Sequence, residues 1–338
     1  MKILVTGATG FIGSAFSKLA LTHGHEIGGM MLPTENPPRS LSQSDAENSP
    51  KTSIVSGDPE PGRDALPRVP ADRPVGPTGA GRPDAGKLVW IKGTLADLPW
   101  RAIEHFKPDA CVHFAWIATP GVYLESPENE KHLEWSLNLA RRLKAIGLRQ
   151  FVGVGTCIEY RITDAPLSEE RTPVDPTTLY SRCKNALRET LAAEARRDGT
   201  QFCWGRVFYP YGVGEHPARL CSALLQKLRR GEPLVLKTPH STKDYIYIED
   251  LAAAILLTVE QQFAGTINWG TGIGISVRQL ADTLAAMLGR PELVAELSPP
   301  ETDPLGFVVA DATRLRQLGW QPRFDLEQGL RKLMQGIS

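Results

Sequence analysis

The sequence of 338 residues is poor in cysteine, carries no excess charge of either sign and has no long apolar run. Its five cysteines show no Cys-x-x-Cys spacing, so we expect a reduced state, as in the cytoplasm. The one close histidine pair is His23 and His25, and no neighbouring residue completes a set of metal ligands. We therefore expect no structural or catalytic metal.

The chain has no excess of positive or negative charge, because Lys and Arg together number 38, and Asp and Glu also number 38. A net charge of zero gives no electrostatic reason to expect nucleic acid or an anionic membrane as a partner. No apolar run is long enough to span a bilayer, and the first expected strand starts directly after Met1, which leaves no room for a signal peptide. We therefore expect a cytoplasmic protein that acts on a small-molecule ligand.

What the sequence does contain is a nucleotide-binding pattern at its start. The apolar run 3–5 predicts a strand buried on both faces, and residues 14–21 predict a helix. Gly7, Gly10 and Gly13 stand between them, in the strand–turn–helix context that gives this glycine spacing its meaning. Such a turn brings backbone N–H groups and the positive end of the helix dipole to the phosphates of a dinucleotide.

Strands that alternate with helices predict an α/β fold with a Rossmann-type, doubly wound parallel sheet. We place this dinucleotide-binding domain at 1–212, with some later segments, about 240–272, returning to it. Shorter elements beyond this domain predict a smaller C-terminal cap, mainly 213–338, that binds the substrate over the carboxyl ends of the strands.

The segment 33–86 interrupts the alternation after the second expected strand, 25–32. It holds eleven of the 27 prolines of the chain and shows no apolar periodicity. Proline at this density removes backbone donors and blocks helices, and too few apolar groups remain to offset the entropy of ordering. We expect this segment to be a disordered insertion.

The end of the second expected strand bears on the choice of cofactor. In a dinucleotide fold, an acid about 20 residues after the glycines binds the ribose 2′-hydroxyl. Met30, Met31 and Leu32 stand near that place, so no carboxylate there repels a 2′-phosphate. No arginine directly follows to attract one either. We expect NADP or NAD, with NADP slightly favoured.

Tyr180 and Lys184 lie four residues apart in a segment expected to be helical, 177–197, and hence on one helix face. A tyrosine that acts as acid or base near neutrality needs its pKa lowered by roughly three units, equivalent to about 4 kcal/mol. Positive charge on Lys184 and on an oxidised nicotinamide would supply such a shift. Thr156, at the end of the expected strand 151–155, offers a hydroxyl to the substrate.

These features resemble the extended short-chain dehydrogenase/reductase superfamily, in its NAD-dependent epimerase/dehydratase family of nucleotide-sugar enzymes. The resemblance runs nearly end to end outside 33–86. The matching stretches are TGATGFIG at 6–13, HFA at 113–115, YSRCK at 180–184, KDYIYIEDLAAA at 243–254, NWGTG at 268–272, and VVAD with LGWQP at 308–322.

The resemblance implies a role for each matching residue. Tyr180 is the acid/base, Lys184 lowers its pKa and holds the nicotinamide ribose, and Thr156 holds the reacting oxygen while hydride moves between C4 of a hexose and the nicotinamide. The implied cofactor-binding residues are Gly7, Thr9, Gly10, Phe11, Ile12, Gly13, Leu95, Phe114, Ala115, Tyr180 and Lys184. The implied substrate-binding residues are Thr156, Tyr209, Arg219 and Lys243, the last two for the diphosphate. A homodimer is expected by the same analogy.

Departures from the family pattern narrow the reaction. The 4,6-dehydratases follow the threonine with Asp-Glu, where this chain has Cys157 and Ile158, and Glu159 comes one residue late. The run GTCIEY at 155–160, with Trp116 beside the site, resembles the reductases of deoxysugar pathways. We therefore favour reduction of the 4-keto group of an NDP-4-keto-6-deoxy sugar by NAD(P)H, in deoxysugar or surface polysaccharide biosynthesis. A redox-neutral nucleotide-sugar 4-epimerase with retained NAD stays open, as does a non-catalytic dinucleotide-binding regulatory protein.

Overall fold

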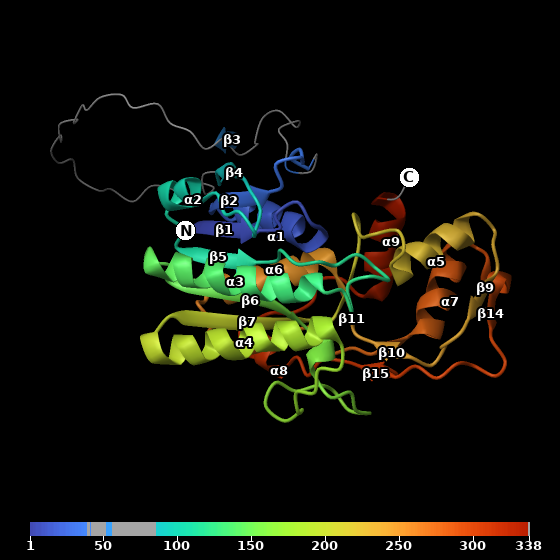
Figure 1. Ribbon diagram of the computed structural model, residues 1–338. Helices are drawn as coiled ribbons and strands as arrows, with labels where there is room; N and C mark the ends of the chain where they lie inside the picture. Colours follow the sequence, from blue (N-terminus) through green and yellow to red (C-terminus); the bar gives the residue numbers. More distant parts are fainter. Residues whose placement is uncertain (39–40, 42–51, 56–85, 337–338) are drawn as a thin grey trace, which may run out of the picture.

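The computed structural model describes residues 1–38, 41, 52–55 and 86–336. Its main sheet has eight parallel strands in the order β12-β7-β6-β5-β1-β2-β4-β3 (Figure 1). The strands are β1 (Lys2–Thr6), β2 (Glu26–Met31), β3 (Thr52–Val55), β4 (Leu88–Lys92), β5 (Ala110–His113), β6 (Gln150–Thr156), β7 (Gln201–Val207) and β12 (Gly265–Trp269). The predicted α/β fold with a parallel Rossmann-type sheet is confirmed.

Helices cover both faces of this sheet, which is why its strands are continuously apolar. Ile3 and Val5 of β1 pack into the core on the side of α1 and α6, while Leu4 packs on the side of α2, α3 and α4. The helices are α1 (Phe11–Thr22), α2 (Trp100–Phe106), α3 (Glu128–Ala145), α4 (Leu179–Asp198), α5 (Leu220–Arg229), α6 (Ile248–Glu260), α7 (Val277–Met287), α8 (Thr313–Gln317) and α9 (Leu326–Gly336). The sheet is therefore doubly wound, and its strand order reverses beside β1, where such sheets bind ligands.

A smaller lobe lies beyond one end of the main sheet, on the right of Figure 1, and contains α5, α7 and α9. Its short strands are β9 (Leu234–Leu236), β10 (Thr242–Lys243), β13 (Ile275–Ser276), β14 (Val294–Glu296) and β15 (Phe307–Val308). The pair β8 (Tyr209–Tyr211) and β11 (Tyr245–Tyr247) joins the segment that leaves the main sheet to the segment that returns to it. After that return, α6 packs against α1 and β12 pairs with β7.

We expected the whole segment 33–86 to be disordered, but part of it forms a strand. Residues 52–55 make up β3, which pairs in parallel with β4 at the edge of the main sheet. The residues just after β2 also have a defined structure, because Glu35 N–H donates to the carbonyl of Leu32 and closes a turn around Pro33. The rest of the expected insertion, at 39–40, 42–51 and 56–85, lies outside the described residues.

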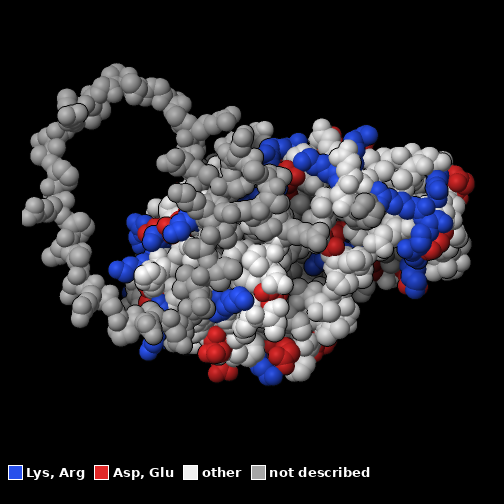
Figure 2. Space-filling model, turned by 90° about the horizontal axis from the view of Figure 1, so that it is seen from above, with Lys and Arg blue, Asp and Glu red and all other residues white. Residues whose placement is uncertain are grey.

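The surface mixes charges of both signs. Figure 2 shows Lys and Arg side chains together with Asp and Glu side chains on one face of the molecule. Arg230 and Glu232 form one exposed pair of opposite charge. In the part of the chain that the structure describes, no helix combines the length and the apolar character that a bilayer span requires.

Candidate active site

A cavity of about 1280 Å³ lies between the carboxyl ends of the main strands and the smaller lobe. Residues that follow β1, β5 and β6 line one side, and Pro304 and Leu305 line the other. Of the residues predicted to act in binding or catalysis, the cavity is lined by Gly7, Thr9, Gly10, Phe11, Ile12, Gly13, Leu95, Phe114, Ala115, Thr156, Tyr180, Lys184, Tyr209 and Arg219. The structure thus brings together every predicted site residue except Lys243.

The glycine turn leaves room for a ligand's phosphates next to the backbone. Gly7 has a φ of +68°, and a Cβ there would lie 3.0 Å from the amide nitrogen of Ala115. A Cβ at Gly13 would lie 2.2 Å from the carbonyl oxygen of Gly7, so α1 can pack this closely only because Gly13 has no side chain. Gly10 precedes α1 and provides no side-chain cap, which leaves the first-turn N–H groups available to an anion.

A carboxylate that the sequence reading overlooked lies beside this turn. Glu35 lines the cavity, and its Oε2 accepts hydrogen bonds from Thr9 Oγ1 at 2.9 Å and from the backbone N–H of Leu32 at 3.1 Å. The turn around Pro33 folds Glu35 back to the end of β2, although it stands three residues further along the chain than Leu32. The signal was present as Leu-Pro-Thr-Glu, a sequence that favours a turn with proline in its second position.

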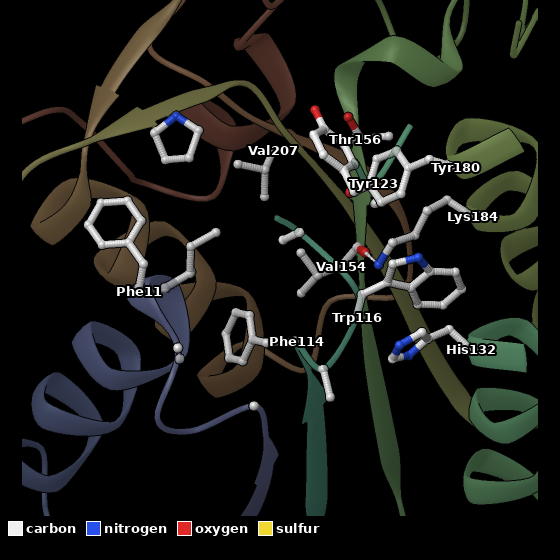
Figure 3. A pocket seen from close by; sticks show the side chains of 18 of the residues that line it. Phe11, Phe114, Trp116, Tyr123, His132, Val154, Thr156, Tyr180, Lys184 and Val207 are labelled. Carbon is white, nitrogen blue, oxygen red and sulfur yellow. Dashed lines mark hydrogen bonds between the residues drawn. The ribbon is translucent and has the colours of Figure 1, made fainter. Parts of the chain in front are cut away.

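Tyr180 and Lys184 project from the first turns of α4 into the cavity (Figure 3). The helix begins at this place because Thr178 caps it: its Oγ1 accepts from Ser181 N–H at 3.1 Å, and Ser181 Oγ accepts from Thr178 N–H in return. The backbone N–H of Tyr180 donates to Leu124 O at 2.9 Å, which ties the helix start to the loop after β5.

Lys184 is almost completely buried, at 2 % exposure. Its Nζ donates to the carbonyl of Val154 at 2.8 Å and lies 4.0 Å from the centre of the Trp116 ring. Burial lowers the pKa of Lys184 to about 7, although the charge of Glu159 opposes this effect. The amine is therefore poised between its charged and neutral forms near neutral pH.

The pKa of Tyr180 is raised, not lowered as we predicted. Burial is the main cause, and the neighbouring groups Tyr123, Glu159 and Cys157 add to it, while Arg219 opposes it. The Lys184 ammonium lies 5.8 Å from the Tyr180 ring centre and donates its hydrogen bond to the carbonyl of Val154. Tyr180 consequently holds its proton at neutral pH, which is the state that a proton donor needs.

Thr156 ends β6 and caps a short 3₁₀ helix, Cys157–Glu159, that turns Glu159 away from the cavity. Glu159 is fully buried; its carboxylate accepts from Thr156 N–H at 2.8 Å and from the Arg206 guanidinium, also at 2.8 Å. Trp204 Nε1 donates to the same carboxylate. Glu159 thus forms a buried ion pair, whereas Cys157 and Ile158 line the cavity.

Sequence reasoning missed Tyr123, which lies beside the predicted catalytic tyrosine. Its ring meets the Tyr180 ring edge to face, with the centroids 4.9 Å apart and the planes at 89°. In Figure 3 the side chains of Tyr123, Thr156 and Tyr180 lie together at one end of the cavity. Nothing in the loop sequence singles out Tyr123, because the contact depends on how the loop folds against α4.

Lys243 does not line the cavity, so its assignment to a diphosphate site is not supported. Its Nζ donates to Asp303 Oδ2 at 2.9 Å and to the carbonyl of Leu305, and the side chain is buried. Because the Lys243 ammonium is already paired, Arg219 is the better candidate to bind the diphosphate of the substrate. Arg219 lines the cavity at the start of α5, and among the described residues it has no ion-pair partner.

The cavity lining near Thr156 and Tyr180 contains an apolar wall next to polar side chains such as Arg161 and Asp175. The wall consists of Cys157, Ile158, Ile162 and Leu305, which pack with Tyr209 in one hydrophobic cluster. Burial raises the pKa of Cys157 to about 12, so its thiol stays neutral at physiological pH. Within the described ranges, no group of three or more His, Cys, Asp or Glu residues is placed to hold a metal ion.

Comparison with known proteins gives a consistent result. The model of the NAD dependent epimerase/dehydratase family matches residues 3–270. A UDP-glucose 4-epimerase of Corynebacterium glutamicum is 26% identical over 343 residues, covering 95% of this chain and 91% of that protein. A dTDP-4-dehydro-6-deoxyglucose reductase of Escherichia coli is 26% identical over 183 residues, covering 49% of this chain and 55% of that protein. Among solved structures, the NAD complex of Thermus thermophilus UDP-glucose 4-epimerase has a TM-score of 0.76 at 23% identity, covering 99% and 98% of the two chains.

Proposed function

Because this chain belongs to the NAD dependent epimerase/dehydratase family, we propose that it reduces the 4-keto group of an NDP-4-keto-6-deoxy sugar with NADH. The reaction is a step in deoxysugar or surface polysaccharide biosynthesis, and the enzyme acts in the cytoplasm. Its working unit is a homodimer, as is usual for the superfamily.

The cavity suits a dinucleotide because the backbone at Gly7 and Gly13 leaves no space for side chains and the first turn of α1 is uncapped. Leu95, Phe114 and Ala115 add an apolar lining for the rings. When bound, the nicotinamide supplies the hydride for the reduction.

NAD is favoured over NADP by the position of Glu35. Its carboxylate lies 2.9 Å from Thr9 Oγ1, within the glycine turn and at the end of β2. A carboxylate at this place accepts from the ribose 2′-hydroxyl and repels a 2′-phosphate. Our first preference for NADP rested on residues 30–32 alone, and Glu35 reverses it.

Three side chains carry out the proton chemistry. Tyr180 donates its proton to the oxygen that becomes the C4 hydroxyl, because its raised pKa keeps the phenol protonated. Thr156 donates a hydrogen bond to the same oxygen and orients it. Lys184 holds the nicotinamide ribose, and its positive charge stabilises the phenolate left on Tyr180.

The observation that carries the choice of substrate is the apolar wall of Cys157, Ile158, Ile162 and Leu305. A 6-deoxy sugar has a methyl group on C5, which such a wall accepts without loss of hydrogen bonds. A 6-hydroxyl group would lose its hydrogen bonds to water there without replacement. Cys157 and Ile158 also lack the carboxylates that a 4,6-dehydratase requires.

A redox-neutral 4-epimerase is the second candidate, since the UDP-glucose 4-epimerase of Corynebacterium glutamicum is similar over 95% of this chain. Such an enzyme keeps NAD bound and returns the hydride to the opposite face of the sugar. It would accept a 6-hydroxylated hexose, which the apolar wall disfavours.

Measuring the absorbance of the nicotinamide distinguishes the reductase from the epimerase. Purified protein is mixed with NADH and an NDP-4-keto-6-deoxyhexose, and separately with UDP-glucose without added cofactor. A stoichiometric loss of NADH in the first mixture supports the reductase. Steady absorbance there, together with formation of UDP-galactose in the second, would favour the epimerase.

A further inference from the structure

The buried amine of Lys184 lacks the partner that a buried charge usually has. In the described part of the chain, no carboxylate is in ion-pair contact with its Nζ, and the carbonyl of Val154 is its hydrogen-bond acceptor. A buried ammonium normally needs an opposite charge, because it has lost its hydration. Some other group must compensate if Lys184 is to stay charged.

The indole of Trp116 lies where a partner for the ammonium would be expected, with its ring centre 4.0 Å from Lys184 Nζ. The face of an indole carries partial negative charge and attracts cations, more strongly than the ring of phenylalanine does. In Figure 3 the Trp116 ring lies between the Lys184 amine and the ring of His132.

Trp116 is held in this orientation from two sides. Its Nε1 donates to Asn129 Oδ1 at 2.7 Å, and Asn129 is fully buried and donates in turn to the carbonyls of Tyr123 and Ser126. The far side of the indole stacks on the ring of His132, with the centroids 5.4 Å apart. The indole therefore faces the amine as part of a fixed array rather than as a mobile side chain.

Other titratable groups around Lys184 do not substitute for the indole. His113 and His132 are kept neutral, since burial, aided by the charge of Lys184, lowers the pKa of His113 to about 3 and that of His132 to about 4. Tyr180 is protonated, and the carboxylate of Glu159 is already paired with Arg206. Among the described residues, the indole and the carbonyl of Val154 are thus the groups whose negative potential meets the amine directly.

We propose that Trp116 is a positioning residue that keeps the Lys184 amine charged and in place, its aromatic face standing where a carboxylate would otherwise be needed. The proposal rests on the proposed function only in assigning Lys184 to catalysis. Its test therefore reads the charge of Lys184 directly and requires no turnover.

The test replaces Trp116 by tryptophans that carry one, two and three fluorine atoms, introduced at this single position in the full-length protein. Fluorine withdraws charge from the ring face but leaves the size of the indole and its N–H donor nearly unchanged. The protonation of Lys184 is followed by NMR of ¹³C-labelled lysine over a pH titration. Loss of the signal in Lys184→Arg assigns the resonance.

We expect the titration midpoint of Lys184 to fall with each added fluorine, by about half a pH unit to one and a half units in total. Trp116→Phe, with its weaker face, should also give a midpoint below that of the unmodified protein. A midpoint that stays constant or rises across the series would overturn the proposal and leave Trp116 a packing residue.

Trp100 provides a matched control. Its ring makes a cation–π contact of nearly the same length, 4.1 Å, with Arg142 outside the cavity. The same fluorinated residues at position 100 should leave the Lys184 midpoint unchanged. Because the titration needs no substrate, a failed search for reductase activity would contradict the proposed function without affecting this result.

Discussion

The carboxylate of Glu159 accepts a hydrogen bond from the guanidinium of Arg206 at 2.8 Å, with the Glu159 side chain fully buried and that of Arg206 2% exposed. This pair keeps the carboxylate of Glu159 out of the cavity lining, although Glu159 stands only three residues after Thr156. It fixes the 3₁₀ turn that presents Cys157 and Ile158 to the cavity. A buried charge left without its partner is strongly destabilising, so the pair makes a prediction about stability.

Glu159→Ala should lower the free energy of unfolding by about 3–5 kcal/mol, because Arg206 would keep a buried charge without a partner. Denaturant unfolding measures the loss. The matched control is Asp282→Ala, which removes an exposed partner of Arg278 and should cost less than about 1 kcal/mol. Equal losses in the two variants would contradict the role given to the buried pair.

Tyr180→Phe should reduce kcat by about 10²–10⁴ with little change in melting temperature, because it removes the proton donor and leaves the ring in place. The neighbouring phenol gives the control: Tyr123→Phe keeps the edge-to-face contact at 4.9 Å and should retain more activity. Near-normal turnover in Tyr180→Phe would refute the assignment of the acid.

Glu35→Gln should raise the preference for NADPH over NADH, measured as the ratio of the two kcat/KM values, by about tenfold or more. The change removes the charge that repels a 2′-phosphate but preserves the shape of the side chain. Glu26→Gln, which alters an acid paired with Lys2, serves as the control and should leave the ratio unchanged. If Glu35→Gln also leaves the ratio unchanged, Glu35 does not determine the preference between a ribose 2′-hydroxyl and a 2′-phosphate.

The wild-type enzyme should lose kcat/KM as the pH rises through the pKa of Lys184, which burial lowers to about 7. A lowered pKa means that the amine gives up its proton at a lower pH than usual, so the charge that stabilises the Tyr180 phenolate disappears on the alkaline side. The arginine of Lys184→Arg remains charged throughout this pH range. This variant should have a lower kcat/KM overall, without the decrease on the alkaline side. If kcat/KM of Lys184→Arg still decreases at alkaline pH with the same midpoint, the decrease belongs to the titration of another group.

Ile158→Asn should reduce the preference of the enzyme for a 6-deoxy sugar over its 6-hydroxylated analogue. The apolar wall is expected to discriminate by up to about 10²-fold, which is the limit for an apolar pocket that excludes one hydroxyl group. The ratio of kcat/KM for the two sugars measures this. Ile162→Val, which keeps the wall apolar, is the control, and an unchanged ratio in Ile158→Asn would exclude the wall as the determinant.

Local patterns were enough to predict the sheet, the glycine turn and the residues Thr156, Tyr180 and Lys184. Each of these follows from a short stretch whose pattern determines the element, and the structure places the three side chains at the cavity as expected. The strand β3 escaped prediction because its four residues lie in a proline-rich segment and gain their stability from pairing with β4.

The features that sequence reasoning misassigned or overlooked depend on contacts between distant segments. Lys243 was assigned to a diphosphate but is paired with Asp303, 60 positions away. Trp116 was expected beside the site, but its contact with an amine 68 positions further along the chain was not. Glu35 reaches the glycine turn only because the chain reverses at Pro33. Spacing along the chain carries no record of such contacts.

The central claim is that a nicotinamide transfers hydride to C4 of a 4-keto-6-deoxy sugar while Tyr180 protonates the oxygen on C4. The most direct measurement is to supply NADH deuterated at the transferred position of C4, together with an NDP-4-keto-6-deoxyhexose, and to examine the product by NMR. We predict one deuterium at C4 of the sugar for each NADH consumed, and almost none with Tyr180→Phe. A product without deuterium at C4, or unconsumed NADH beside an isomerised sugar, would contradict the account.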